Sequence, residues 1–316
     1  LWLRYQVMVT GRLTTTISQK TKVAQSNHLH IEFKKMSIQL NLDGLSFCIF
    51  NPGLSCIESI YHLSLPASMP PIVAEQEVQK YLNEERALCQ DFDTIKVLHN
   101  NEQFAFVPEK LFATEHLFEY LKFNVAEYRN QIISHDTLSG EKMINVYIPN
   151  AAINRVLRET YGIFEYEHFT TTLLGVLLMH NPQKKDAIYA HFDKNAFHLV
   201  VFKEGQLAFF NRFAFEEPID MLYYLLFSLE QLAIDTEVTP LYLLGDIIRN
   251  SERYYLIYKY VRFIYFLPPQ KNNPFCQNMD PTLAKQNFIL THTFWKVKGK
   301  STIVTDYWLL KLTIDN

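Results

Sequence analysis

Apolar and polar residues alternate at 36–43, which is the two-residue period of a strand with one buried face. The dipeptide Asp43-Gly44 follows, and it readily adopts the positive φ angles of a type I′ turn. The apolar run at 45–50 therefore predicts a returning strand. A second turn and an apolar segment that ends at Leu65 complete an expected three-stranded meander.

The pattern recurs 150 residues later, where residues 38–43 (IQLNLD) are answered by residues 188–193 (IYAHFD). Each alternating segment precedes a returning strand, a third strand and a proline-initiated helix. These helices are expected at 70–88 in the first copy and at 218–234 in the second. The chain is therefore predicted to contain two related halves.

Shorter segments complete the predicted layered α/β fold. Between the two halves, strands are expected at 94–98, 103–107, 131–135, 143–148 and 164–169, with helices at 114–123, 151–161 and 170–179. After the second meander, strands at 240–244 and 262–267 flank a helix at 248–260, and no element is expected after Pro268. We divide the chain into a poorly ordered basic leader (1–35), a first lobe with a strand-helix insertion (36–180), a second lobe (181–290) and an irregular C-terminal tail (291–316).

The composition narrows the class of protein. A hydrophobic fraction of 48% over 316 residues is enough for a sizeable core, and a net charge of -3 does not favour nucleic acid or an anionic membrane as a partner. The longest apolar segments are too short or too charged to span a bilayer. Four scattered cysteines indicate a reducing compartment, so we expect a cytoplasmic protein with a protein partner, no nucleic acid and no integral membrane segment.

The two meander-and-helix units, with an insertion between them, resemble the superfamily of actin, heat-shock chaperones and sugar kinases. The SIQLNLDGLSFCIF run at 37–50 is also similar to the start of an uncharacterised bacterial family classed as a domain of unknown function. The layout is similar to the cytoplasmic domains of type IV pilus assembly protein M and type II secretion protein L. The resemblance covers about residues 30–290. It implies an α/β fold of the duplicated actin-like ATPase (ribonuclease H-like) kind, with two β-meander-plus-helix lobes.

The resemblance also implies a candidate nucleotide cleft. In active members, each of the two hairpin turns is a Gly-rich loop preceded by an Asp that positions a metal-bound water. Here the two Asp positions hold Asn41 and His191, and the glycine positions hold Asp43 and Asp193, whose carboxylates would repel phosphate. The strand that binds adenosine keeps one glycine of its pair. The cleft candidates are Asn41, Asp43, Gly44, His191, Asp193, Lys194, Gly245 and Asp246.

These replacements favour a protein that has lost catalysis. With 9 glycines in 316 residues, the chain is poor in the residue that phosphate loops need. We expect no catalytic residue, no metal and no cofactor, and we interpret the chain as a non-catalytic actin-like scaffold that binds another protein, as the pilus and secretion relatives do. The alternative is an ATP-binding phosphotransferase or ATPase with degenerate phosphate loops, using Asp43, Asp193 and Asp246 with magnesium. A nucleic-acid binder with a basic leader is a third, less favoured hypothesis.

Three further groupings have simpler interpretations. Cys48 and Cys56 lie symmetrically about the second turn, so they are expected to face each other as small buried thiols and not as a disulfide. His28 and His30 share one face of a possible strand, but no third ligand has suitable spacing, so surface histidines are the preferred interpretation. The aromatic run at 254–260 is expected to build mainly core, with exposed rings suited to a partner.

Overall fold

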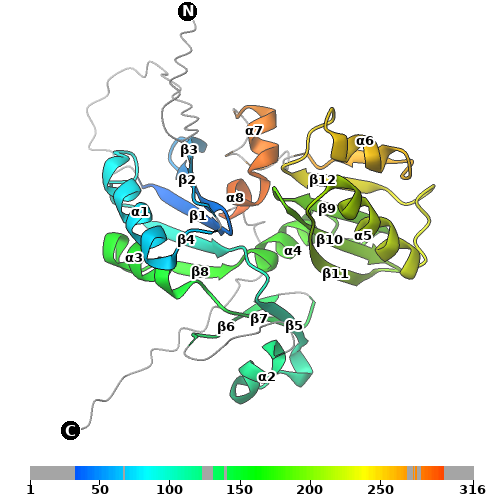
Figure 1. Ribbon diagram of the computed structural model, residues 1–316, viewed down its shortest axis with the longest axis horizontal. Coiled ribbons are helices and arrows are strands. Elements are labelled where there is room, and N and C mark those ends of the chain that lie inside the picture. The colour runs from blue at the N-terminus through cyan, green and yellow to red at the C-terminus, as the bar shows by residue number, and fades with distance from the viewer. Residues whose placement is uncertain are drawn as a thin grey trace, which may run out of the picture.

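The computed structural model describes residues 33–66, 68–122, 131–138, 141–268, 273, 275 and 279–294. Two five-stranded sheets form two lobes, and a smaller third sheet lies beside them (Figure 1). Most of the predicted leader and the last residues of the predicted tail lie outside the described residues, and so do His28 and His30.

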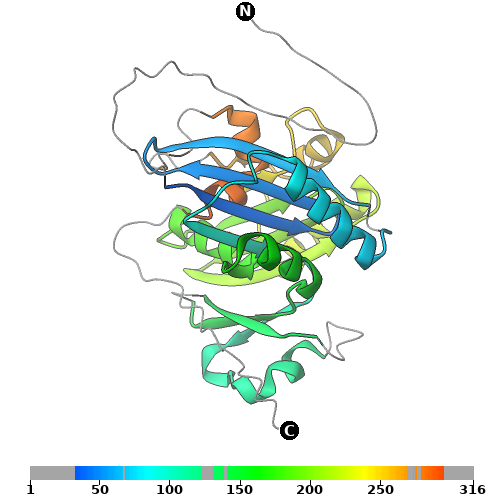
Figure 2. The same cartoon turned by 90° about the vertical axis from the view of Figure 1, so that its left-hand side faces the viewer.

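The first lobe is a sheet in the order β3-β2-β1-β4-β8. Its strands are β1 (Lys35–Asn41), β2 (Gly44–Asn51), β3 (Cys56–Ser64), β4 (Thr94–His99) and β8 (Glu165–His168). The first three form the predicted antiparallel meander, and β4 and β8 run parallel to β1. Helices α1 (Pro71–Glu84) and α3 (Ala151–Tyr161) cover one face of this sheet (Figure 2).

The second lobe repeats this topology in the order β11-β10-β9-β12-β13. Its strands are β9 (Ala187–Phe192), β10 (Ala196–Lys203), β11 (Gln206–Ala214), β12 (Leu241–Gly245) and β13 (Ile264–Phe266). Helices α5 (Pro218–Gln231) and α6 (Glu252–Tyr258) pack on one face, as α1 and α3 do in the first lobe. Pro218 at the first helical position and a capping box of Glu217 and Asp220 fix the start of α5. The prediction of a duplicated α/β fold is confirmed.

The insertion between β4 and α3 forms the third sheet, in the order β5-β7-β6. Its strands are β5 (Phe104–Pro108), β6 (Ser134–Leu138) and β7 (Met143–Tyr147). The short helices η2 (Thr114–His116) and α2 (Leu117–Leu121) lie where one longer helix is predicted, and η1 (Glu109–Leu111) precedes them. This subdomain has a small core of its own around Leu121 and Val146.

Helices α4 (Phe169–His180) and α8 (Phe288–His292) lie between the two lobes (Figure 1). α4 is apolar on almost all sides because it packs against both sheets, where Phe169 and Leu173 join the core that contains Leu98 and Val200. α8 follows α7 (Pro281–Gln286), and the backbone oxygen of its Leu290 accepts a hydrogen bond from Oγ of Ser37 on β1 at 2.9 Å. The expectation of no element after Pro268 is therefore wrong.

The first hairpin turn differs from the prediction by one residue. Asn41 pairs with Gly44, so the two turn residues are Leu42 and Asp43. Neither is among the described residues with positive φ, which rules out the type I′ turn that the sequence predicts. Gly44 instead starts β2 with a φ of 144°, and a Cβ there would lie 2.0 Å from the carbonyl oxygen of Leu63. The close approach of β3 therefore requires this glycine.

Cys48 and Cys56 do not face each other. Cys48 pairs with Ile60, and Cys56 pairs with Asn51. The turn consists of residues 52–55, and a β-bulge shifts the register between Ile49 and Phe50. The centre of the hairpin therefore lies later in the chain than the predicted symmetric pairing of Cys48 with Cys56 requires. Cys48 is buried and Cys56 is half-buried.

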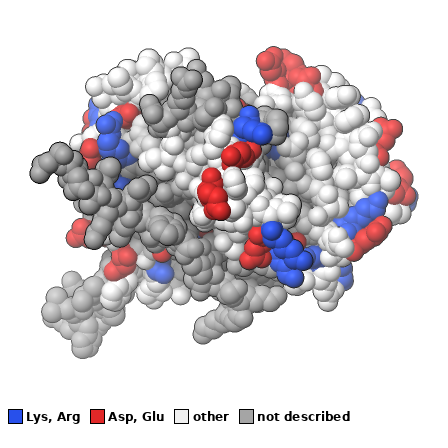
Figure 3. All heavy atoms as spheres, turned by 90° about the horizontal axis from the view of Figure 1, so that it is seen from below, with Lys and Arg blue, Asp and Glu red and all other residues white. Residues whose placement is uncertain are grey.

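No helix among the described residues is long and apolar enough to cross a membrane. On the face of the molecule shown in Figure 3, the charged side chains of the described residues form small groups, most of which contain both acidic and basic residues. Wide uncharged areas lie between these groups. Among the described residues, this face therefore presents no extended surface of one sign.

Candidate functional site

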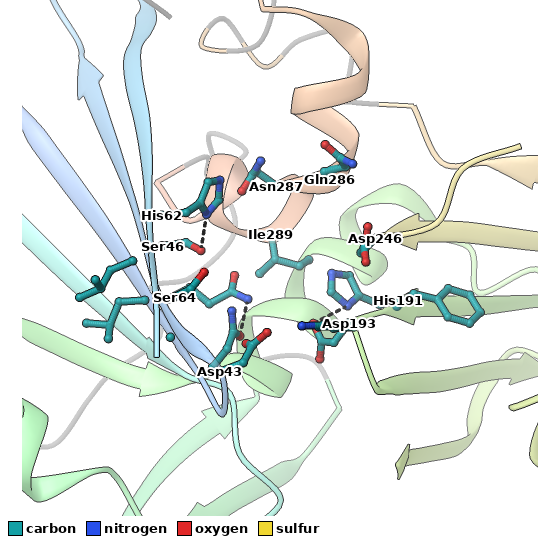
Figure 4. A pocket seen from close by; sticks show the side chains of 17 residues that line it. Asp43, Ser46, His62, Ser64, His191, Asp193, Asp246, Gln286, Asn287 and Ile289 are labelled. Carbon is teal, nitrogen blue, oxygen red and sulfur yellow. Dashed lines mark hydrogen bonds and ion pairs between the residues drawn. The ribbon is translucent and has the colours of Figure 1, made fainter. Parts of the chain in front are cut away.

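A cavity of about 430 Å³ lies between the two lobes, beneath α7 and α8 (Figure 4). Asp43 approaches it from the first lobe, and His191, Asp193 and Asp246 approach it from the second. Gln286, Asn287 and Ile289 close the upper side (Figure 4). Of the predicted cleft residues, the structure brings these to the cavity wall: Asn41, Asp43, Gly44, His191, Asp193, Lys194 and Asp246. Their role in nucleotide binding stays a prediction.

The side-chain amide of Asn100 contacts both lobes beside this cavity, and we call this contact the Asn100 bridge. Nδ2 of Asn100, the residue after β4, donates to Oδ1 of Asn41 at 2.9 Å and to Oδ2 of Asp193 at 3.0 Å. The backbone N–H of Asn100 donates to the carbonyl oxygen of Leu40 at 2.8 Å, which fixes the amide beside the end of β1. The sequence analysis missed Asn100. Its place after a parallel strand was the available signal, because ligands of open α/β sheets bind at the carboxyl ends of strands.

The hairpin of β9 and β10 holds three convergent polar side chains. His191 and His198 are directly opposed on the two strands, and Asp193 follows His191 by two residues, so all three share one face. Nδ1 of His191 lies 3.9 Å from one carboxylate oxygen of Asp193, and Nδ1 of His198 lies 4.0 Å from the other. The sequence analysis missed His198, although pairing the two predicted strands through their short turn would have placed it opposite His191.

Burial controls the protonation of both histidines. His198 is fully buried, and burial lowers its pKa well below the ordinary value, with the neighbouring His191 adding to the effect. Burial also lowers the pKa of His191, while the Asp193 carboxylate opposes this shift. Among the residues that the structure describes, neither ring nitrogen of His198 has a hydrogen-bond partner, and Nδ1 of His191 has none.

Gly245 lies behind the cavity wall at the end of β12, with a φ of 76°. A Cβ there would lie 2.2 Å from the carbonyl oxygen of Phe192 and 3.0 Å from Nε2 of His191. The neighbouring Asp246 is held by Arg253, whose Nη2 lies 2.6 Å from the Asp246 carbonyl oxygen and 3.3 Å from its carboxylate. The glycine therefore serves the packing of the second hairpin, and Asp246 already has a cationic partner.

Acidic residues outnumber basic ones around the cleft. Asp43, Asp193 and Asp246 line the first cavity, against Lys194 alone among lysines and arginines of its described lining. A second cavity of about 890 Å³ has Asn100 in its wall and shares Asp43, Asp193 and Lys194 with the first. It adds Glu102, Glu216, Asp220 and Arg212. Both cavities therefore disfavour an anion that arrives without its own cation.

One hydrogen-bonded pair in the first cavity has the residue types of a nucleophile and its base. Oγ of Ser46 and Nδ1 of His62 are 2.8 Å apart, on opposed positions of β2 and β3. Burial lowers the pKa of His62. Within the described part of the chain, no carboxylate is recorded in hydrogen-bond contact with this imidazole, so the pair lacks the third group that orients the base in a catalytic triad.

Two solved structures are similar to the chain, and the first of them supports the fold. The chain is similar to a Bacteroides thetaiotaomicron protein "with actin-like ATPase fold and unknown function", at 20% identity and a TM-score of 0.67 over 77% of this chain and 94% of that one. Ethanolamine utilization protein EutJ from Carboxydothermus hydrogenoformans matches at 10% identity and a TM-score of 0.44, over 84% of this chain and 91% of that one. No curated protein matches the chain.

The first of these structures and the duplicated sheet topology show that the fold is that of the actin-like ATPases. One family's sequence model matches residues 24–264, which is more than half of the chain. The chain therefore belongs to the family described as "Protein of unknown function (DUF3822)".

Proposed function

We propose that this chain is a non-catalytic cytoplasmic protein of the actin-like ATPase fold that acts as a scaffold for another protein. The observation that carries the proposal is the Asn100 bridge, in which one side-chain amide contacts Asn41 and Asp193 from the two lobes. By resemblance, the phosphates of a bound nucleotide would lie between these two hairpin turns. Here one protein side chain contacts both sides and links them directly.

The shape of the first turn supports the same proposal. A phosphate loop needs several backbone N–H groups that converge on one point. The β1–β2 turn contains only Leu42 and Asp43, because Asn41 already pairs with Gly44. Its tip carries a carboxylate, and the second hairpin places Asp193 on the facing wall of the cavity (Figure 4).

One observation favours the alternative of an ATP-binding phosphotransferase or ATPase. Three carboxylates, those of Asp43, Asp193 and Asp246, line a single cavity of about 430 Å³. A magnesium ion that arrives with ATP would neutralise part of their charge. Against this, Asp193 accepts from Asn100 and Asp246 is paired with Arg253, so two of the three carboxylates are already engaged.

A thermal shift assay with ATP and magnesium separates the two functions. We expect no change in Tm at millimolar nucleotide, since the cleft has neither a phosphate loop nor a surplus of bases. Nucleotide held at 100 times its Kd would instead add about 2.7 kcal/mol of stability. A shift that Asp193→Asn abolishes, and that Glu159→Gln on the exposed surface of α3 preserves, would replace the scaffold proposal with the enzymatic one.

The outer face of α5 supports the binding of a protein. Ile219, Tyr223 and Phe227 follow one another at intervals of four residues, so they form a single line along the helix. Their side chains are 59%, 60% and 46% exposed, respectively. The rings of Tyr223 and Phe227 stack at 5.7 Å, which gives a continuous apolar surface. We call these three residues the α5 apolar stripe and propose that the partner covers it.

Substitution within the stripe tests this part of the proposal. With the full chain as bait in its native cells, Tyr223→Ala with Phe227→Ala is expected to reduce capture of the main partner at least tenfold, because aromatic side chains dominate protein interfaces. Ile72→Ala on the corresponding helix of the first lobe, where Ile72 is 70% exposed, is the matched control. Both variants should keep the wild-type melting curve, since exposed substitutions change stability by about 0.5 kcal/mol or less. Equal capture by the stripe variant would contradict this surface, and no specific capture by the wild type would contradict the scaffold.

A further inference from the structure

We propose that His191, Asp193 and His198 form a binding site for a divalent transition-metal ion of the zinc type. The ligand atoms of the three side chains all lie within 4.8 Å of one another. Two of the ligands, His191 and Asp193, are cleft candidates, but a site with two imidazole donors differs in chemistry from the magnesium-nucleotide site of an active relative.

The backbone positions the three ligands together. His191 and His198 are register partners on β9 and β10, and the N–H of Asp193 donates to the carbonyl oxygen of Ala196 at 2.9 Å, which closes the turn. Zinc bonds of about 2.0–2.2 Å place tetrahedral ligands about 3.4 Å apart. The separations of 3.9 and 4.0 Å between the two Asp193 oxygens and the two Nδ1 atoms exceed this value by about 0.5 Å, so small side-chain movements would bring the carboxylate within bonding range of an ion held by either imidazole.

The two histidines have buried ring nitrogens that make no hydrogen bond to any described residue. His198 is 0% exposed, and neither of its ring nitrogens has a partner within the described ranges. Nδ1 of the buried His191 is in the same state. A buried polar atom without a hydrogen bond is unfavourable, and native proteins contain few of them. A metal ion would satisfy one nitrogen on each ring at once.

The surroundings of the site suit a bound cation. The ring of Phe169 lies 5.0 Å from that of His191 and 5.2 Å from that of His198, so it forms an apolar floor. Asn100 donates to Oδ2 of Asp193 at 3.0 Å, which is the outer contact that commonly orients a carboxylate ligand. An ion held here would connect the second lobe to the Asn100 bridge.

The donor set determines the kind of ion. Two imidazoles and one carboxylate suit zinc, cobalt or iron in the divalent state, while magnesium prefers oxygen ligands in an octahedral arrangement. Arg212 is the register partner of His198 on β11, and its positive charge opposes a nearby cation. Its ion pair with Glu102, at 3.4 Å, reduces this effect. Replacing Arg212 by glutamine is therefore expected to tighten metal binding several-fold.

The test uses the full chain, stripped with EDTA and titrated with Co²⁺ while its visible d–d absorption is recorded. We expect one equivalent to bind, Zn²⁺ to displace it and Mg²⁺ to leave the spectrum unchanged. His198→Gln should abolish the band, and Asp193→Asn should weaken binding at least tenfold. Two controls should bind as the wild type does: His116→Gln, at an imidazole that is 57% exposed, and His28→Gln with His30→Gln in the leader.

Melting curves in EDTA show whether each variant folds. If His198→Gln fails to fold, Asp193→Asn carries the test, because the Asp193 side chain is 22% exposed and lies at a turn. The proposal is overturned if the wild type shows no d–d band at millimolar Co²⁺. It is equally overturned if the band persists with unchanged affinity in the site variants that fold, which would assign the ion to other side chains.

Discussion

Replacing Lys96 with methionine is expected to lower the free energy of unfolding by about 3–5 kcal/mol. Lys96 on β4 and Glu167 on the neighbouring β8 form an ion pair of 2.7 Å, with side chains that are 10% and 1% exposed. Glu167 also raises the pKa of the buried Asp136, so a second carboxyl lies close by. Methionine would fill the space of the lysine stem but leave the Glu167 carboxylate buried without its cation. Urea unfolding at pH 7 measures the loss.

The matched control for this prediction is Arg155→Met. Arg155 pairs with Glu75 between α3 and α1, and its side chain is 65% exposed. Because its cation is so open to solvent, this pair is expected to contribute about 1 kcal/mol or less. The double change Lys96→Met with Glu167→Leu should recover most of the stability, because it removes both buried charges. Equal losses in Lys96→Met and Arg155→Met would contradict the assignment of Lys96 as the essential partner of Glu167.

Acid is expected to unfold the protein steeply below pH 6.5. Burial lowers the pKa of His99 to about 3, and it lowers those of His180 and His292 to about 4. The folded chain keeps these imidazoles neutral, while the unfolded chain protonates them near pH 6.5. Their contribution to stability is therefore present above pH 6.5 and is lost as the pH falls toward the folded pKa values. Each group costs about 1.4 kcal/mol per pH unit over this range.

Asp136 has the opposite effect on the pH dependence of stability. Its carboxyl is buried, and burial together with Glu167 raises its pKa to about 8, so it favours the folded state as the pH falls from 8 toward 4. These three histidines against one carboxyl leave a net loss of about 3 kcal/mol per pH unit below pH 6.5. Burial also lowers the pKa values of His62, His168, His191 and His198, which adds to this loss. Stability should thus be greatest near pH 6.5.

Urea unfolding at a series of pH values tests this balance. His99→Gln should flatten the decline below pH 6.5, since Nδ1 of His99 accepts from the backbone N–H of Asn150 at 3.2 Å and must lose that bond on protonation. His116→Gln is the control, because His116 is exposed on η2. The same slope in the wild type and in His99→Gln would show that His99 does not contribute to the acid sensitivity.

The duplicated fold was accessible from the sequence because its signals are local. Alternation at 36–43 and again at 188–193 identified the first strand of each meander, and prolines at 71 and 218 identified the first helical residue of α1 and α5. The type and order of nearly all elements up to residue 266 follow from such patterns. Their pairing then follows from the short turns between them.

The details that failed depend on contacts between distant segments. Position 44 requires glycine because the carbonyl of Leu63 lies close to it, and not because of the turn conformation. A β-bulge shifts the pairing of Cys48. The short helix α8 has too little length to form alone and exists because two sheets enclose it. In the site, Asn100 and His198 acquire their importance only when three separate strands meet. Only the order and pairing of the predicted strands indicate such residues.

The position of α8 also has a consequence for how the chain is made. Ser37 and Leu290, which are joined by a hydrogen bond, are 253 residues apart in the sequence. The face of the first sheet that contains Phe50 and Ile60 is covered by Leu290. On the ribosome, this face therefore stays uncovered until about 250 further residues have been synthesised. Contacts of such long range form slowly and leave nascent apolar surface open to chaperones.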